Sequence, residues 1–187
     1  MPVARKRPGQ AINLEAARQA ALDGDSAALE RLAVALVPRV RNLVRYLVRG
    51  DSEVDDIAQE AMIDFLLGMR SYRGDGSLTA WTDRVTVRAT FGYLRRNRRA
   101  RREVWTESDL MIVESPDGTP DDYAERRRVV ALLDNISDDQ RHAMVLHYVL
   151  GMTVPEVAEM VEVPIETVRS RLRVGMARLR ELNGAEE

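Results

Sequence analysis

The chain has 187 residues, of which 45% are hydrophobic and 31% are charged, and its formal net charge is −2. This length suffices for two small domains, while the lack of cysteine and the poor spacing of His142 and His147 for a helical metal pair predict neither a metal site nor a cofactor. No apolar run approaches membrane-spanning length and the first ten residues lack the apolar segment of a secretion signal, so we expect a cytoplasmic protein without membrane insertion.

Charge is distributed in blocks along the chain. Eight arginines and no acidic residue lie from Arg84 to Arg102, and the next stretch, from Glu103 to Glu125, holds eight acidic residues and no basic one. Five more arginines lie between Arg169 and Arg180. Because local charge rather than the total decides the binding partner, the basic blocks indicate nucleic acid.

The first part of the chain is predicted to be helical. Residues 1–13 are expected to be disordered, a helix is expected from Leu14 to Leu22, and Asp25 or Ser26 can cap the next helix. That helix is long, and Pro38 can kink it. Its buried side is marked by Leu29, Leu32, Leu36, Val40, Leu43, Val44 and Leu47.

An acidic helix is expected next. Asp51 or Ser52 can cap it, and it runs to about Met69. Its apolar stripe comprises Val54, Ile57, Ala58, Ala61, Phe65 and Met69. The loop that follows contains Gly74 and Gly76, but no Gly-Lys-Ser/Thr follows and no strand precedes, which excludes a nucleotide-binding loop.

The helix expected from Leu78 to about Arg98 carries most of the first basic block. Its predicted buried stripe is Leu78, Trp81, Val85, Ala89 and Gly92, and another face gathers Arg84, Arg88, Phe91, Arg95 and Arg98. Arginines beside aromatic rings suit partly unstacked DNA, because guanidinium groups follow the backbone while rings or pockets receive extruded bases. The alternative is that Trp81 and Phe91 are core residues under arginines, and for Trp81 core packing is favoured.

Residues 103–125 are predicted to connect two helical domains. Pro116, Gly118 and Pro120 prevent a continuous helix there, so this acidic segment is expected to be a flexible, solvated tether. The predicted fold class is therefore all-α, with small domains at residues 14–102 and 126–183.

Two helices joined by a tight turn are predicted near the C-terminus. Thr153 and Glu156 have the spacing of a capping box, so a helix begins there. Pro164 interrupts the helical run, so this helix ends near Glu162 and the next begins near Ile165.

The second of these helices has two distinct faces. Val168, Leu172, Gly175 and Leu179 share the stripe expected to be buried, and Glu166, Arg169, Ser170 and Arg173 lie opposite. Arginine near the start of a recognition helix can bind guanine bidentately, so the pattern is typical of a helix-turn-helix that reads the major groove. The alternative is a bundle helix with a solvated arginine face.

Four sequence segments, and their order along the chain, resemble bacterial RNA polymerase sigma factors of the extracytoplasmic-function (ECF) group, which keep sigma regions two and four. DDIAQEAMIDF resembles the core-binding helix, RGDGSLTAW the loop and tryptophan, and YLRRNRR the end of the promoter-melting helix. LDNISDDQRHAMVLHYVLGMTVPEVAEMVEVPIETVRSRL resembles region four. The resemblance implies region two at residues 14–102, region four at residues 126–183, and an alternative sigma factor without catalytic activity of its own.

The resemblance also implies partners and site residues. Region four would bind the flap of the second-largest subunit of core polymerase. The clamp helices of the largest subunit would be bound by Asp56, Gln59, Glu60 and Ile63. The minus-ten element would be bound and melted by Gly74, Ser77, Trp81, Arg84, Arg88, Phe91, Arg95 and Arg98. The minus-thirty-five element would be read by Thr167, Arg169, Ser170, Arg171 and Arg173. An anti-sigma factor is a further expected partner. For the linker, the resemblance implies an alternative to a plain tether, in which the linker enters the interior of the polymerase.

Some positions depart from the family pattern. Thr82 and Asp83 stand where leucine and tyrosine are usual, and Arg88 where asparagine is frequent, which predicts an unusual minus-ten sequence. Val174 and Gly175 replace a basic residue and an alanine, which predicts fewer contacts with the DNA backbone. Glycine there should also weaken the helix by up to about 1 kcal/mol relative to alanine.

Two other function classes are open to the same residues. One is a stand-alone, dimeric helix-turn-helix regulator with a sensing N-terminal domain, which would bind a palindrome unaided. The other is a DNA-modifying enzyme, for which we find no constellation of carboxylates, cysteines or histidines. A sigma factor, by contrast, gives promoter-specific transcripts only with core polymerase.

Overall fold

A computed structural model describes residues 12–50, 52–97 and 120–184 of the chain. Every regular element within these ranges is a helix, which confirms the all-α prediction. The predicted tether up to residue 119, Arg98 and residues 1–11 lie outside the described residues. Two residues of the segment predicted to be disordered, residues 1–13, are ordered: Ile12 packs against an apolar cluster and Asn13 caps the first helix. The ordered chain therefore begins slightly earlier than expected.

The first two helices begin at polar capping side chains. In α1 (Leu14–Leu22) the Asn13 carboxamide oxygen accepts from the amide of Ala16 at 3.0 Å. In α2 (Ser26–Leu47) the Asp25 carboxylate accepts from Ala27 and Ala28, which confirms the predicted cap. The helix α2 continues through Pro38, and its predicted stripe is buried, apart from a partly buried Leu29.

The acidic helix α3 (Val54–Gly68) begins differently from the prediction. Its N-cap residue is Glu53, which makes no capping hydrogen bond through its side chain, so the cap predicted at Ser52 is wrong, and Asp51 lies outside the described residues. Carboxylates at Asp55 and Asp56 in the first turn interact favourably with the helix dipole instead. The predicted apolar stripe from Val54 to Met69 is buried in full.

The helix α4 (Leu78–Arg96) buries polar residues as well as apolar ones. Ser77 caps it by accepting from the amide of Ala80 at 3.1 Å. Of the predicted stripe, Leu78 and Ala89 are buried, and Trp81, Val85 and Gly92 are partly buried. The stripe prediction missed Thr82, Asp83, Thr86 and Thr90, all buried. The threonine hydroxyls donate to carbonyl oxygens one turn earlier at 2.8 to 2.9 Å, which satisfies them inside the core.

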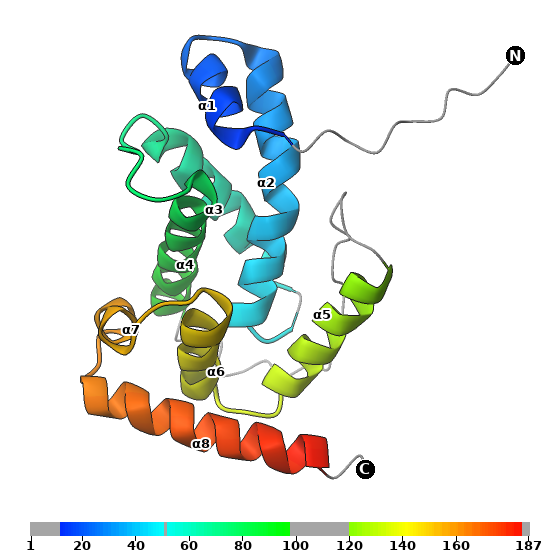
Figure 1. Cartoon of the computed structure of the whole chain (residues 1–187), viewed down its shortest axis with the longest axis vertical. Coiled ribbons are helices and arrows are strands. Elements are labelled where there is room, and N and C mark those ends of the chain that lie inside the picture. Colours follow the sequence, from blue (N-terminus) through cyan, green and yellow to red (C-terminus); the bar gives the residue numbers. More distant parts are fainter. Residues whose placement is uncertain (1–11, 51, 98–119, 185–187) are drawn as a thin grey trace, which may run out of the picture.

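The second group of helices lies below the first in Figure 1. It comprises α5 (Pro120–Leu133), α6 (Asp138–Met144), the π-helix η2 (Val145–Val149), α7 (Val154–Val161) and α8 (Ile165–Gly184). The helix α5 begins inside the segment predicted to be linker. The Thr153 capping box and the bounds predicted for α7 and α8 are confirmed, and Glu162 ends α7 in the left-handed region at φ 56°.

The two groups of helices share a hydrophobic cluster. Leu43 and Leu47 of α2 and Val87 and Phe91 of α4 belong to the same buried cluster as residues of α5 to α8. A hydrogen bond supports this contact at the C-cap of α2, where the buried Arg141 donates to the carbonyl of Val48 at 2.9 Å. The groups therefore pack as one body.

Candidate nucleic-acid and polymerase interfaces

The helix α8 presents a basic face at its N-terminal end. Val168 and Leu172 are buried and fix the orientation of the helix, which leaves Arg169, Ser170 and Arg173 exposed as predicted. Arg169 forms an ion pair with Glu166 on the same helix. Because this pair is exposed and local, it leaves the guanidinium available for other partners.

The neighbouring site residues of α8 are less exposed. Thr167 is partly buried, and Arg171 directs its guanidinium to Asp139 of α6, with Nη2 2.6 Å from Oδ2. The predicted site residue Arg171 thus also ties α8 to α6. Periodicity alone could not reveal this pair, because its members lie 32 residues apart in sequence.

Gly175 lies where α8 crosses α6. A Cβ atom at this position would meet Gln140 Cβ and Met144 Cγ at 3.4 Å, which is ordinary van der Waals contact. Alanine would therefore fit, so no steric requirement offsets the helical cost predicted for this glycine.

The arginine face of α4 lies toward α7. Arg84, Arg88 and Arg95 are exposed, but Phe91, predicted on the same face, is only 7% exposed and belongs to the shared apolar cluster. Its ring lies 4.9 Å from that of His142, edge to face. In this arrangement Phe91 is a core residue, which is the alternative that the sequence left open.

The loop before α4 is held by α1. Gly74 and Gly76 have φ of 84° and 91°, which favour glycine. The Tyr72 hydroxyl lies 2.8 Å from Glu15 Oε1 and 2.7 Å from the Gly76 carbonyl oxygen, and the Leu78 amide also donates to Glu15. The hydrogen bond to Glu15 raises the pKa of Tyr72. Sequence reasoning missed Glu15 and Tyr72 because their contacts span 57 residues.

Trp81 lies one turn into α4, just after this loop in sequence. Its ring packs against Phe65 at 5.3 Å and Tyr72 at 5.5 Å between centroids, and its side chain is only partly buried. Trp81 therefore packs at the edge of the core cluster, and part of its side chain stays exposed. Ser77, predicted to contact DNA, is the N-cap of α4, and its hydroxyl also lies 2.8 Å from that of Thr79.

The outer face of α3 combines acidic and apolar side chains. Asp56 and Gln59 are exposed, and Ile63 is 48% exposed. Glu60 is partly buried and pairs with Arg96 of α4. Sequence reasoning missed Leu67, which is 78% exposed one turn beyond Ile63 and lies outside the buried stripe. Exposed apolar side chains of this size beside carboxylates are typical of a protein-binding surface.

Neither a metal centre nor a membrane span is found in the described parts of the chain. No group of three or more His, Cys, Asp or Glu side chains there could hold a metal ion. No helix within those parts is long and apolar enough to cross a membrane. The histidine His142 is structural, because its Nε2 lies 3.0 Å from the Leu47 carbonyl oxygen.

Two family models match the chain. The model of sigma-70 region 2 matches residues 32–100, and the model of sigma-70, region 4 matches residues 126–179. The first match contains the α3 face, the loop and α4, and the second contains α7 and the exposed arginines of α8. The chain belongs to the sigma-70 family.

Curated relatives identify the group within this family. The chain is 29% identical over 162 residues to the ECF RNA polymerase sigma-E factor of Escherichia coli (strain K12), covering 80% of this chain and 83% of the relative. It is 28% identical over 152 residues to that of Haemophilus influenzae, covering 73% and 79%. The chain is thus an ECF sigma factor, an alternative sigma factor that directs RNA polymerase to promoters.

Solved structures share its fold. One is CnrH in complex with the cytosolic domain of CnrY, with a TM-score of 0.54 and 22% identity over 92% of this chain and 97% of the other. Another is the sigma factor RpoE in complex with the anti-sigma factor NepR from Bartonella quintana, with a TM-score of 0.58 and 21% identity over 85% and 98%.

Proposed function

We propose that this ECF sigma factor reads the minus-thirty-five element with Arg169, Ser170 and Arg173, assisted by Thr167 and Arg171. The observation that carries the proposal is the exposure of the three readers on a helix whose opposite face is buried. Such a helix can enter the major groove without losing its own packing, and arginine can bind guanine while neighbouring groups hold phosphates.

The second part of the proposal concerns the minus-ten element. The loop from Gly74 to Thr79, together with Trp81, would hold an extruded base, and the face of Arg84, Arg88 and Arg95, continued by Arg98, would hold the separated strand. Positive φ at both loop glycines supports this, because backbone without side chains can approach a base closely. Phe91 would join this face only when α7 leaves it.

The third part concerns RNA polymerase. Asp56, Gln59, Glu60 and Ile63 would bind the clamp helices of the largest subunit, and region four would bind the flap of the second-largest subunit. The mixture of exposed carboxylates and exposed apolar side chains on α3 supports the first contact. Since RNA polymerase catalyses RNA synthesis, this factor needs no catalytic activity of its own. It would act in the cytoplasm, where it meets RNA polymerase.

An anti-sigma factor is the remaining proposed partner. CnrH and RpoE, whose folds this chain shares, were solved in complex with the cytosolic domain of CnrY and with the anti-sigma factor NepR. A partner that covers the exposed α3 face would keep the factor from polymerase.

Reconstituted transcription with core polymerase tests the proposal. Arg169→Ala or Arg173→Ala should weaken recognition of the minus-thirty-five element by about 1 to 3 kcal/mol, because each removes contacts to bases or phosphates. Arg178→Ala is the matched control, since Arg178 is exposed further along α8 and pairs with Glu181 at 3.2 Å. Equal discrimination between intact and scrambled upstream elements by all variants would reject the assignment. Binding of a palindrome without polymerase would favour the stand-alone regulator instead.

A further inference from the structure

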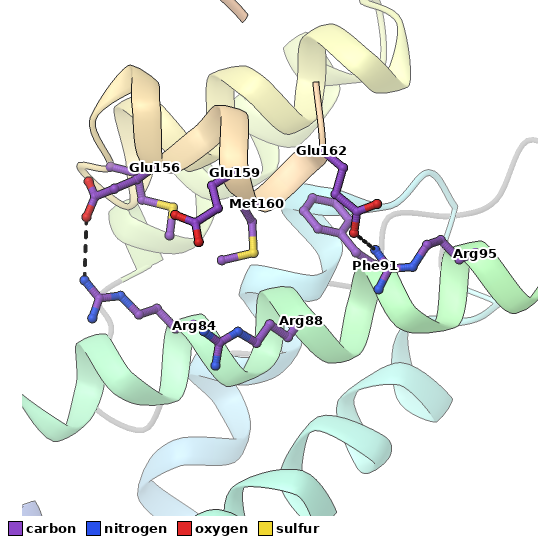
Figure 2. A pocket seen from close by; sticks show the side chains of 9 residues that line it. Arg84, Arg88, Phe91, Arg95, Glu156, Glu159, Met160 and Glu162 are labelled. Atoms are coloured by element: carbon purple, nitrogen blue, oxygen red, sulfur yellow. Dashed lines mark hydrogen bonds and ion pairs between the residues drawn. The ribbon is translucent and has the colours of Figure 1, made fainter. Parts of the chain in front are cut away.

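The arginine face of α4 lies opposite three glutamates of region four. Figure 2 shows α7 facing α4, with the carboxylates of Glu156, Glu159 and Glu162 pointing toward α4. Arg84 lies 3.9 Å from Glu156 and Arg95 lies 3.4 Å from Glu162. Arg88 and Glu159 line the same cavity, of about 360 Å³, between these two ion pairs.

Apolar packing holds α7 in this position. Met160 of α7 lines the cavity together with Phe91, whose ring is buried against His142 of α6. Just after the C-terminal end of α2, Arg49 donates to the carbonyl of Asp134 at 2.8 Å and to the carboxylate of Asp138 at 2.7 Å. Region four therefore contacts region two at this end of α2 as well as through the charged contact with α4.

Carboxylates opposite a row of arginines have the charge of a phosphate backbone. Glu156 and Glu159 are i, i+3 neighbours on α7 and Glu162 is its C-cap, and the two outer glutamates lie close to Arg84 and Arg95 of α4. We propose that α7 masks the strand-binding face of α4 in the free sigma factor, with Glu156, Glu159 and Glu162 taking the place of DNA phosphates. The inference rests on the proposed function of α4.

The mask is selective for one of the proposed interfaces. The α3 face around Asp56 and Ile63 remains exposed in the closed arrangement, and so do Arg169 and Arg173 on α8. With α7 packed against α4, the chain can thus bind polymerase and a minus-thirty-five duplex, but it cannot bind a separated DNA strand. Strand binding then follows the separation of the two regions.

The ion pairs of the mask are individually weak. The side chains of Arg84 and Glu156 are 50% and 46% exposed, and those of Arg95 and Glu162 are more exposed still. Exposed pairs contribute little each and are screened by salt, so a partner that holds the two regions apart can displace the mask.

The test uses the free, full-length chain. The variant Glu156→Gln/Glu159→Gln/Glu162→Gln removes the three charges, and glutamine at position 156 can still complete the capping box of α7. The control, Glu30→Gln/Asp64→Asn/Glu125→Gln, makes the same change in net charge at exposed positions away from the mask. Fluorescent labels on Val34→Cys and Glu181→Cys, in a chain without other cysteines, report the separation of the two regions.

Binding is measured with a short fluorescein-labelled single-stranded DNA oligonucleotide. We expect the mask variant to bind about tenfold more tightly than the wild type and the control, with a larger label separation. Adding Arg88→Ala/Arg95→Ala to the mask variant should abolish this gain.

Two results would overturn the mask. One is equal affinity and equal label separation in the mask variant and the control. The other is a gain that persists without Arg88 and Arg95, because the glutamates would then repel DNA in general. The function of α4 is tested separately, by promoter opening in the holoenzyme. Normal promoter opening by Arg88→Ala/Arg95→Ala would reject that function, whereas a failure of the oligonucleotide test alone would reject only the mask.

Discussion

The guanidinium of Arg39 on α2 donates two hydrogen bonds to the carboxylate of Asp83 on α4, from Nε to Oδ1 at 2.7 Å and from Nη2 to Oδ2 at 2.6 Å. Asp83 is only 8% exposed, and its hydrogen bond to Arg39 raises the pKa of that guanidinium. Asp83 thus joins two helices of region two.

Asp83→Ala should lower the free energy of unfolding by about 2 kcal/mol, because it removes a charge-assisted bidentate pair at a largely buried position. Urea denaturation followed by circular dichroism measures this loss. Arg31→Ala is the control, since its exposed ion pair with Asp25, at 3.6 Å, should contribute less than about 1 kcal/mol. Equal losses in the two variants would contradict a stabilising role for the Arg39–Asp83 pair.

Stability should fall in mild acid because of His142. Burial lowers the pKa of His142 from 6.5 to about 4. The unfolded chain therefore binds a proton between these pH values that the folded chain does not, so the stabilisation is complete above pH 6.5 and is lost as the pH falls toward 4.

From pH 7.5 to pH 5 this group should reduce the free energy of unfolding by about 2 kcal/mol. His142→Gln keeps a donor for the Leu47 carbonyl but does not titrate, so its denaturation curves should lose that part of the pH dependence. His147→Gln, which leaves His142 in place, should retain it. If both variants follow the wild-type pH profile, His142 is not the group responsible.

Association with core polymerase should depend on the outer face of α3. Asp56→Arg/Ile63→Ala should abolish co-purification with core polymerase and leave the helical content unchanged, because neither side chain packs in the core. We choose Ile63 rather than Glu60 as the second site because Glu60 also pairs with Arg96. Glu30→Arg, an exposed charge reversal on α2, should co-purify normally. Normal recovery of the double variant would move the polymerase contact elsewhere.

Promoter opening should depend on the arginine face of α4. In the holoenzyme, Arg88→Ala/Arg95→Ala should impair formation of the open complex more than closed binding, as followed by permanganate reactivity. The loss of two phosphate contacts should reduce the magnitude of the log–log salt slope by somewhat under about 2 units. A promoter premelted by a mismatched bubble should restore transcription by the variant if these arginines act in melting itself. If they instead hold the strand after melting, the bubble should restore transcription only partly.

The control for this experiment is Arg31→Ala/Arg178→Ala, which removes two exposed arginines away from the α4 face. It should open duplex promoters normally. If the Arg88 and Arg95 variant does so as well, the arginine face has no part in opening.

Short-range residue patterns were enough to predict the local structure of this protein. The capping box of Thr153 and Glu156, the cap at Asp25 and the buried stripe of α3 all follow from residues within a few positions of one another, because helical hydrogen bonds and periodicity act over that range. The exposure of Arg169 and Arg173 followed in the same way from the opposite, apolar stripe of α8. The order of the family strings along the chain was also sufficient to indicate a sigma factor.

Which helix faces pack against one another could not be predicted from these local patterns. The burial of Phe91 depends on the docking of α6 and α7 against α4, and the burial of the α4 threonines depends on the packing of α2 and α3 against α4. The contacts of Glu15 with Tyr72 and of Glu162 with Arg95 span 57 and 67 residues. Such pairs carry no local signal, because the free energy of bringing distant segments together depends on all the apolar surface that they bury at once.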